Sequence, residues 1–137
     1  MADANRKAPR LNEAKFSFID ERVIEDTEHI YVGEMVEQDD STLEVAAATN
    51  AAAKYVLGVS TLEVDNADDG LKLGMISTAV HGMANAGSIL NSDLGELAYV
   101  ADAATVAVSG DNIAGRIAEV DIDGGLVYVD FDPAKKN

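Results

Sequence analysis

The sequence predicts a mainly β protein, a small β-barrel or sandwich built from two similar β-modules, with at most one short helix and an extended N-terminal arm. Short alternations of apolar and polar residues recur from Phe16 onward, turn-forming residues separate them, and the order of these features repeats. All 11 glycines lie between Gly33 and Gly125, whereas Pro9 and Pro133 lie near the ends. Glycine within and proline outside is typical of a turn-rich β body with extended ends.

The length of 137 residues fits one domain. We expect residues 1–15 to form a basic arm, residues 16–132 a single β domain and residues 133–137 a C-terminal tail. The chain has no cysteine, which excludes disulfides, thiol catalysis and cysteine-ligated zinc. No apolar run approaches the roughly 18 residues of a membrane span, and residues 1–15 lack the apolar run of a secretory signal. We therefore expect no membrane partner.

Strands are expected wherever β-branched and aromatic residues alternate with polar ones. These segments are residues 16–19, 29–32, 56–64, 71–76, 113–122 and 126–131. Between the last two, Asp123-Gly124-Gly125 predicts a hairpin turn, because these residues tolerate positive φ. Residues 46–55 are rich in alanine and form either a short helix or a loop with one turn.

The two modules are expected at about residues 33–76 and 95–131. Each opens on a Gly-Glu pair, at Gly33 and Gly95, and each continues to an aliphatic segment with an internal glycine, at Gly58 and Gly115. Two copies are too few for a solenoid, which needs about three or more. They suit two β-modules folded into one small barrel or sandwich. A chance likeness between glycine-punctuated strands is the alternative.

The charge is divided between an acidic body and a short basic arm. The whole chain carries −15, of which residues 1–15 carry +2 and the remainder −17. A field of −17 repels phosphates, so we expect no direct nucleic-acid partner. The acidic excess fits either a requirement for solubility or a salt-rich habitat. The arm is either a solvated terminus or a segment that lies along an acidic partner.

Two acidic turns have part of the pattern of a calcium loop. When an EF-hand spacing is counted from Asp65, Ala67 and Ile76 stand where calcium needs oxygen ligands. The run at residues 65–70 and the run at residues 121–125 are therefore interpreted as hairpin turns. The sequence predicts no metal site.

The two histidines form no recognised catalytic or metal-binding motif. His29 lies in an expected strand, and His81 is interpreted as a turn or interface residue because it precedes Gly82. Neither histidine has H-x-x-x-H or H-E-x-x-H spacing. The chain also lacks a G-x-S-x-G elbow, a G-x-x-x-x-G-K-[ST] loop and a G-x-G-x-x-G loop. We expect no enzymatic activity, no catalytic residue and no cofactor.

Several of these segments together resemble one known family. They are Gly33-Glu34-Met35-Val36, residues 46–53, Val56-Leu57-Gly58-Val59, residues 95–100, Gly115, Val120-Asp121 and residues 127–131. Over about residues 30–131 the chain resembles the tailed-phage capsid cement (head decoration) proteins of the small β-barrel type.

The resemblance implies a virion structural protein without catalysis. Such proteins bind the outer surface of an expanded capsid, often as trimers, and clamp neighbouring major capsid subunits. The implied partners are the major capsid protein and further copies of the chain in a homotrimer. The implied location is the outer surface of the virion, after synthesis in the host cytoplasm.

The candidates for capsid contact follow from charge and position alone. They are Arg6, Lys7, Arg10 and Lys15. One alternative is a β-module associated with a phage tail or fibre. A second alternative is a metal-dependent hydrolase.

Overall fold

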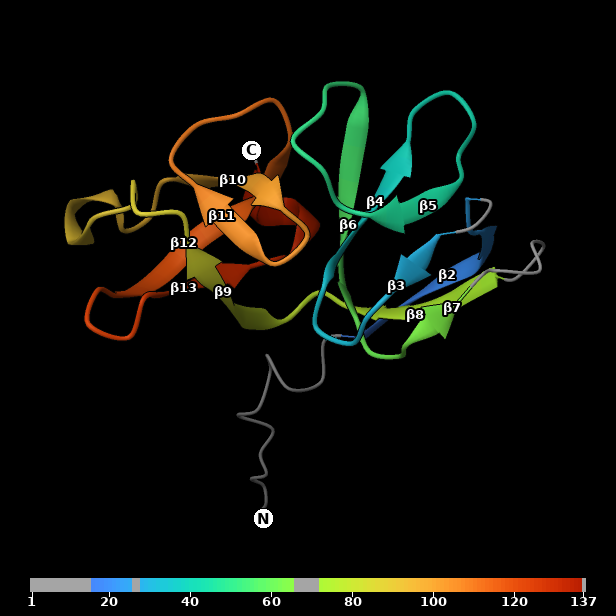
Figure 1. Ribbon diagram of the computed structural model, residues 1–137, viewed down its shortest axis with the longest axis horizontal. Helices are drawn as coiled ribbons and strands as arrows, with labels where there is room; N and C mark the ends of the chain where they lie inside the picture. The colour runs from blue at the N-terminus through green and yellow to red at the C-terminus, as the bar shows by residue number, and fades with distance from the viewer. Residues whose placement is uncertain (1–15, 26–27, 66–71, 137) are drawn as a thin grey trace, which may run out of the picture.

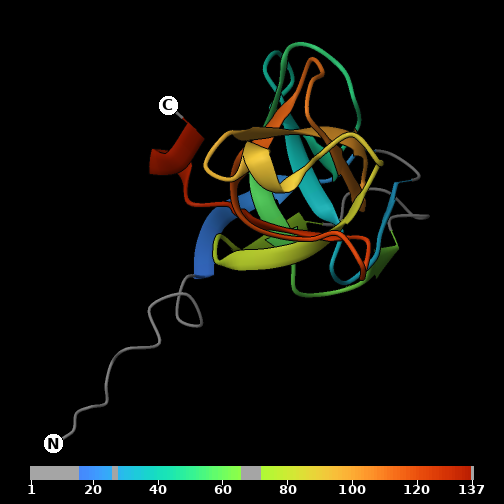
Figure 2. The same ribbon diagram turned by 90° about the vertical axis from the view of Figure 1, so that its left-hand side faces the viewer.

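The computed structural model describes residues 16–25, 28–65 and 72–136, which form a mainly β protein as the sequence predicts. Figure 1 shows two groups of strands side by side. We call the described part of residues 16–77 module one and residues 80–130 module two. Figure 2 shows the same strands from the side.

Module one contains a five-stranded antiparallel sheet in the order β2-β8-β6-β4-β5. Its strands are β2 (Phe16–Val23), β4 (Met35–Asp39), β5 (Val45–Ala47), β6 (Lys54–Ser60) and β8 (Lys72–Ser77). The short strands β3 (His29–Ile30) and β7 (Val64–Asp65) pair with each other. A parallel bridge between Ile24 and Val45 links the end of β2 to β5. The sheet therefore curls back toward its own first strand.

Module two is a closed barrel in the order β10-β11-β9-β13-β12, with β12 paired to β10. Its strands are β9 (Val80–Asn85), β10 (Leu97–Asp102), β11 (Thr105–Ala107), β12 (Ile113–Asp121) and β13 (Leu126–Asp130). Only β9 and β11 pair in parallel. The helical segments of the described chain are two short 3-10 turns, η1 (Asn91–Asp93) and η2 (Pro133–Lys136).

The two modules have the same strand order, because β2-β8-β6-β4-β5 corresponds to β9-β13-β12-β10-β11. The registers also correspond. Val36 pairs with Gly58 as Ala98 pairs with Gly115, and in both modules the register shifts immediately after that pair. The paired β-modules that the sequence repeat predicts are therefore visible in the hydrogen-bonding pattern.

The glycines that open the two repeats make the same contacts. The Gly33 amide donates to the Ser60 carbonyl and the Gly95 amide donates to the Ile117 carbonyl, each at 2.9 Å. Gly33 and Gly95 have φ values of 89° and 88°, which favour glycine. The Gly-Glu signal in the sequence thus marks the same tight turn in both modules.

The expected helix is absent, and the loop alternative is correct. Of residues 46–55, the first two end β5 and the last two begin β6, with a loop between them. The expected strand at residues 56–64 is divided, because β6 ends at Ser60 and β7 begins at Val64. A local turn causes the division, since the Ser60 hydroxyl donates to the Leu62 carbonyl at 2.5 Å.

Of the two interpretations of His81, as a turn residue or as an interface residue, the first was wrong. His81 lies within β9, and no clear apolar alternation in the sequence predicts this strand. This strand pairs with β13 on one side and with β11 on the other, so tertiary partners hold it in place. Gly82 leaves room there for the ring of Tyr128, which an added Cβ would approach to 3.2 Å. Because β2 and β9 belong to the repeat, each module begins earlier than the sequence suggested.

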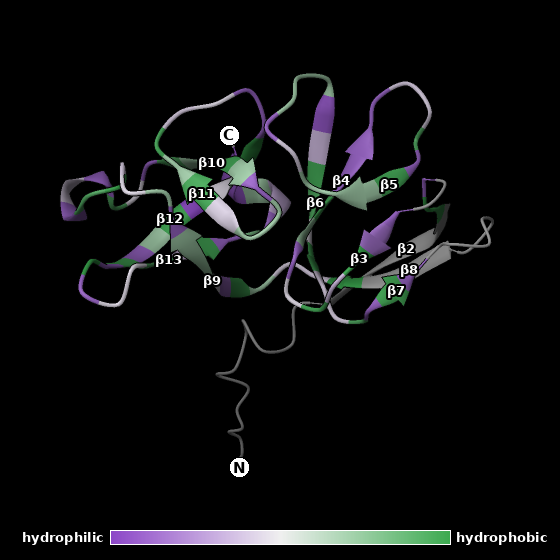
Figure 3. Ribbon diagram, in the orientation of Figure 1, coloured by the Kyte–Doolittle hydropathy of each residue, from purple (hydrophilic) through white to green (hydrophobic). Residues whose placement is uncertain are grey.

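The main hydrophobic core is shared by both modules. Met35, Ala48, Val56 and Val59 of module one pack in one cluster with residues from all five strands of module two and with Phe131. A second, smaller cluster lies within module one and includes Ile24, Val45 and Ile76. Figure 3 shows hydrophobic and hydrophilic segments alternating along strands in both modules. The shared core joins the two modules into one body.

Candidate functional site

The structure does not place the residues that the sequence suggested for capsid contact. Arg6, Lys7, Arg10 and Lys15 lie outside the described residues. No helix within residues 16–25, 28–65 and 72–136 is long and apolar enough to cross a membrane.

The two acidic turns have different outcomes. Of the run at residues 65–70, only Asp65 is described, and it ends β7. The run at residues 121–125 is the predicted hairpin turn between β12 and β13, where the Gly124 amide donates to Asp121 Oδ1 at 3.0 Å. Within the described part of the chain, no group of three or more His, Asp or Glu side chains could hold a metal ion.

Each histidine makes local contacts. His29 stacks on Tyr31 with ring centroids 4.0 Å apart, and its Nε2 lies 2.8 Å from Glu63 Oε2. His81 Nε2 lies 2.7 Å from Ser77 Oγ, and burial lowers the pKa of His81. A serine bonded to a histidine is one part of a catalytic triad. However, Ser77 is only 2% exposed, so its hydroxyl is closed to a substrate.

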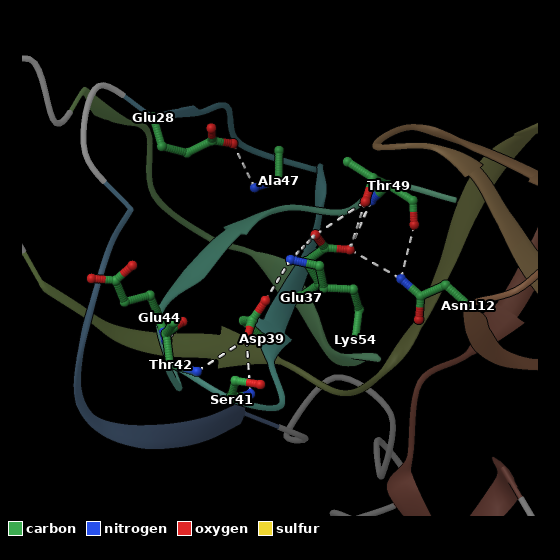
Figure 4. Close-up of polar contacts among 10 residues, drawn as sticks. All are labelled: Glu28, Glu37, Asp39, Ser41, Thr42, Glu44, Ala47, Thr49, Lys54 and Asn112. Carbon is green, nitrogen blue, oxygen red and sulfur yellow. Dashed lines mark hydrogen bonds and ion pairs between the residues drawn. The ribbon is translucent and has the colours of Figure 1, made fainter. Parts of the chain in front are cut away.

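A buried polar cluster lies where the modules meet (Figure 4). Glu37 on β4 is 3% exposed, and its Oε1 accepts hydrogen bonds from the Thr49 amide at 2.8 Å and from Asn112 Nδ2 at 3.0 Å. Asn112 comes from module two and also donates to the Thr49 carbonyl at 2.9 Å. Glu37 and Asn112 together connect the two modules through hydrogen bonds.

An ion pair lies beside Glu37 and is less deeply buried than Glu37 itself. Lys54 Nζ lies 2.9 Å from Asp39 Oδ2 and 3.9 Å from Glu37 Oε2. Burial raises the pKa of Glu37, although bonds from Thr49 oppose this effect. The bond from Lys54 holds the pKa of Asp39 far below its usual value, and the same bond raises the pKa of Lys54. Lys54 and Asp39 are therefore an ion pair that borders a more deeply buried carboxyl group.

The C-terminal turn η2 adds a second connection between the modules. Lys136 Nζ donates to the Val56 carbonyl and lies 3.9 Å from the centre of the Tyr55 ring. Burial lowers the pKa of Lys136 to about 8. A hollow of about 240 Å³ borders this contact, lined by Lys54, Tyr55, Asp111, Asn112, Ile113 and Lys136.

A larger hollow of about 340 Å³ lies on module two. It is lined by Ser92, Asp93, Glu96, Leu97, Tyr99, Val108 and Arg116. Arg116 donates to the Lys135 carbonyl at 2.9 Å and to the Gly95 carbonyl at 3.0 Å. The guanidinium group thus holds two backbone segments in place. In both hollows the cationic side chains that bond to carbonyls therefore have a structural role rather than the arrangement of a catalytic site.

Exposed apolar residues are the surface feature that the sequence reasoning missed. Val32, immediately before Gly33, is 64% exposed, and Leu94, immediately before Gly95, is 57% exposed. We call Val32 and Leu94 the turn tips. The signal was present in the sequence, because an aliphatic residue, glycine and glutamate follow one another at residues 32–34 and again at residues 94–96.

Comparison with protein-family models, curated proteins and solved structures finds no match to this chain.

Proposed function

We propose that this chain is a structural protein of a tailed phage that binds the outer surface of the expanded capsid. It stabilises the capsid by clamping neighbouring major capsid subunits and has no enzymatic activity. The observation that carries the proposal is the build of the molecule: two β-modules of the same strand order share one core, and each exposes an apolar residue at the same turn. Such a body suits binding to a repeating surface.

The physical basis of the stabilisation is linkage. A protein that binds the assembled shell better than its separated subunits shifts the equilibrium toward the shell. Attachment through several contacts strengthens this effect, because the second and later contacts form at a high effective concentration. A homotrimer placed on a three-fold position of the shell multiplies the contacts again.

The charge of the chain supports a partner with basic surface groups. The body outside residues 1–15 carries −17 and the arm carries +2. An acidic body favours encounter with a basic surface, and this attraction weakens with added salt. Arg6, Lys7, Arg10 and Lys15 supply the opposite charge, so the arm suits an acidic part of the shell.

The test is attachment to expanded shells of the phage whose genome encodes the chain. The protein should sediment with the shells in a fixed ratio to the major capsid protein and raise the temperature at which the shells break. Failure to sediment, together with an unchanged breaking temperature, overturns the proposal. Electron microscopy that locates the protein on the tail also overturns it.

Two further measurements examine the arm and the assembly. Deleting residues 2–15 should weaken attachment to the shells while leaving the circular dichroism spectrum of the β body unchanged. Equal attachment of the shortened chain removes the arm from the proposal.

Light scattering should give a trimer or a weakly associating monomer, and a stable dimer contradicts three-fold placement.

A further inference from the structure

The two turn tips are built on the same backbone. In module one the Glu34 amide donates to the Tyr31 carbonyl at 3.1 Å, and in module two the Glu96 amide donates to the Asp93 carbonyl at 2.9 Å. The carbonyl of Glu34 accepts a hydrogen bond from the Ser60 amide, and the carbonyl of Glu96 accepts one from the Ile117 amide. Ser60 and Ile117 are also the residues whose carbonyls accept from the two glycine amides. Each tip is thus held by bonds before and after it, so its side chain projects from a defined position.

Each tip has a second exposed apolar residue close to it. For the first tip this residue lies on the facing segment, and for the second tip it lies in the same turn. Leu62 is 53% exposed and lies in the segment that faces Val32, between the pairs Ile30–Val64 and Gly33–Ser60. Leu90 is 57% exposed and is the N-cap of the η1 turn, whose C-cap is Leu94. Because backbone bonds already hold these turns, little backbone entropy is lost when the apolar side chains bind.

The charges around the tips show which partner fits them. Glu34 and Glu63 lie beside the first tip, and Asp93 and Glu96 lie beside the second. Arg116 is near the second tip and keeps its positive charge, since its guanidinium group donates to the neutral carbonyls of Gly95 and Lys135; the two carboxylates still outnumber it. Another copy of a chain with net charge −15 is repelled here, whereas a surface with Lys or Arg is attracted.

We propose that Val32 and Leu94 are the centres of two equivalent docking sites, one on each module. The sites bind two copies of one partner subunit, which presents an apolar socket bordered by basic side chains. We infer two copies because both tips have the same turn hydrogen bonds and the same glycine φ, and each is bordered by carboxylates, on modules joined by a shared core. The inference rests on the proposed function, in which the repeated partner is the major capsid protein.

The test uses the full chain and the same expanded shells, with Val32→Asp, Leu94→Asp and the double variant. Each single variant should bind at least about tenfold more weakly, because losing one of two linked contacts removes the gain from bivalence. The double variant should not sediment with the shells. All three should melt within about 2 °C of the wild type, because substitutions at exposed positions change stability little.

The matched control is Leu43→Asp. Leu43 is 49% exposed in the turn between β4 and β5, and module two has a shorter turn there, between β10 and β11. This variant should bind as the wild type does. If either single tip variant binds like the wild type, the paired-site inference is overturned. If the wild type itself does not bind, the proposed function fails instead.

A basic border of the socket requires that attachment weakens with salt. Attachment of the wild type should weaken by about tenfold or more between 50 mM and 300 mM sodium chloride, as the carboxylates around the tips are screened. Attachment that is unchanged over this range overturns the basic border of the socket.

Discussion

The two modules share a strand order but close in different ways. In module two, β9 and β11 form two parallel pairs, Ala84 with Thr105 and Asn85 with Val106. In the described part of module one, the corresponding closure is one parallel bridge, between Ile24 and Val45. The same strand order therefore supports a closed barrel in module two and, in module one, a sheet whose first and last strands are joined at one described pair. The repeat thus specifies which strands are neighbours, whereas packing determines how tightly the first and last strands meet.

One pair of corresponding residues shows how far the modules have diverged. Glu37 and Tyr99 each follow the register shift in β4 and β10. Glu37 is buried at the joint between the modules, whereas Tyr99 lines the larger hollow of module two. The same register position thus supports the joint in one module and forms part of the surface in the other.

The largest effect is expected where the modules are most alike. An added Cβ at Gly115 would lie 2.3 Å from the Asp130 carbonyl, and one at Gly58 would lie 2.4 Å from the Ser77 carbonyl. Gly115→Ala and Gly58→Ala should each lower the free energy of unfolding by about 3 kcal/mol, because a paired strand must move. Urea denaturation measures both losses.

Gly82→Ala is the control for these glycines. The atoms nearest to its added Cβ belong to the ring of Tyr128, a side chain that can shift, so the loss should be below about 1 kcal/mol. Unequal losses at Gly58 and Gly115 would break the structural equivalence of the two modules.

The joint between the modules should respond next. Asn112→Ala removes the donor to Glu37 and to the Thr49 carbonyl, so the free energy of unfolding should fall by about 2 kcal/mol. Asn50→Ala is the control, because exposed Asn50 accepts one bond, from the Asp111 amide at 2.9 Å. Its loss should be about 1 kcal/mol or less. Equal losses in thermal or urea unfolding contradict a special role for the buried bonds.

The buried carboxyl group should make the joint sensitive to pH. Because burial raises the pKa of Glu37, the folded protein holds this proton more tightly than the unfolded chain. The resulting stability is present below the ordinary value of 4.5 and is lost as the pH rises through the folded pKa. Glu37→Gln cannot titrate, so its melting temperature relative to wild type should rise from pH 4 to pH 7.

Glu119→Gln serves as the control for losing a carboxylate, since Glu119 is exposed on β12. A constant difference between Glu37→Gln and the wild type at all pH values argues against the buried-proton explanation. Melting curves of both variants and the wild type at pH 4, 5.5 and 7 measure this difference.

The smallest effect is expected in the closure of the two modules. The Glu25 amide donates to the Val45 carbonyl and the Ala86 amide donates to the Val106 carbonyl, both at 2.9 Å. Hydrogen exchange, corrected for intrinsic rates, should be about fivefold faster at Glu25, because a closure held by one bridge opens locally at lower cost. Equal protection at the two amides means that the second parallel pair adds nothing to closure.

Local patterns in the sequence predict much of the fold. The Asp123-Gly124-Gly125 turn and the strands on either side of it are where the sequence predicts them, and the repeated Gly-Glu pairs prove to mark corresponding turns of the two modules. Residues 56–64 look like one strand because their apolar alternation runs through Thr61, Leu62 and Glu63 without a break. The bond between the Ser60 hydroxyl and the Leu62 carbonyl, which forms the turn, has no mark in that alternation.

The turn tips and the buried cluster around Glu37 also differ in whether the sequence contains a signal for them. The turn tips repeat as aliphatic-Gly-Glu, so the sequence contains a signal for them. Glu37 and Asn112 are 75 residues apart and belong to no motif, so only the folded chain brings them together. The strand around His81 is likewise held by its neighbours rather than by its own pattern.

The β class, the Asp123-Gly124-Gly125 hairpin and the repeat could be predicted from the chain alone, because they depend on glycine, turn residues and alternation over a few positions. The closure of each module, the burial of Glu37 and the joint through Asn112 and Lys136 depend on tertiary contacts. These features depend on which distant segments meet and on how much water they exclude. Two repeats with one strand order could therefore become one tightly closed module and one loosely closed module.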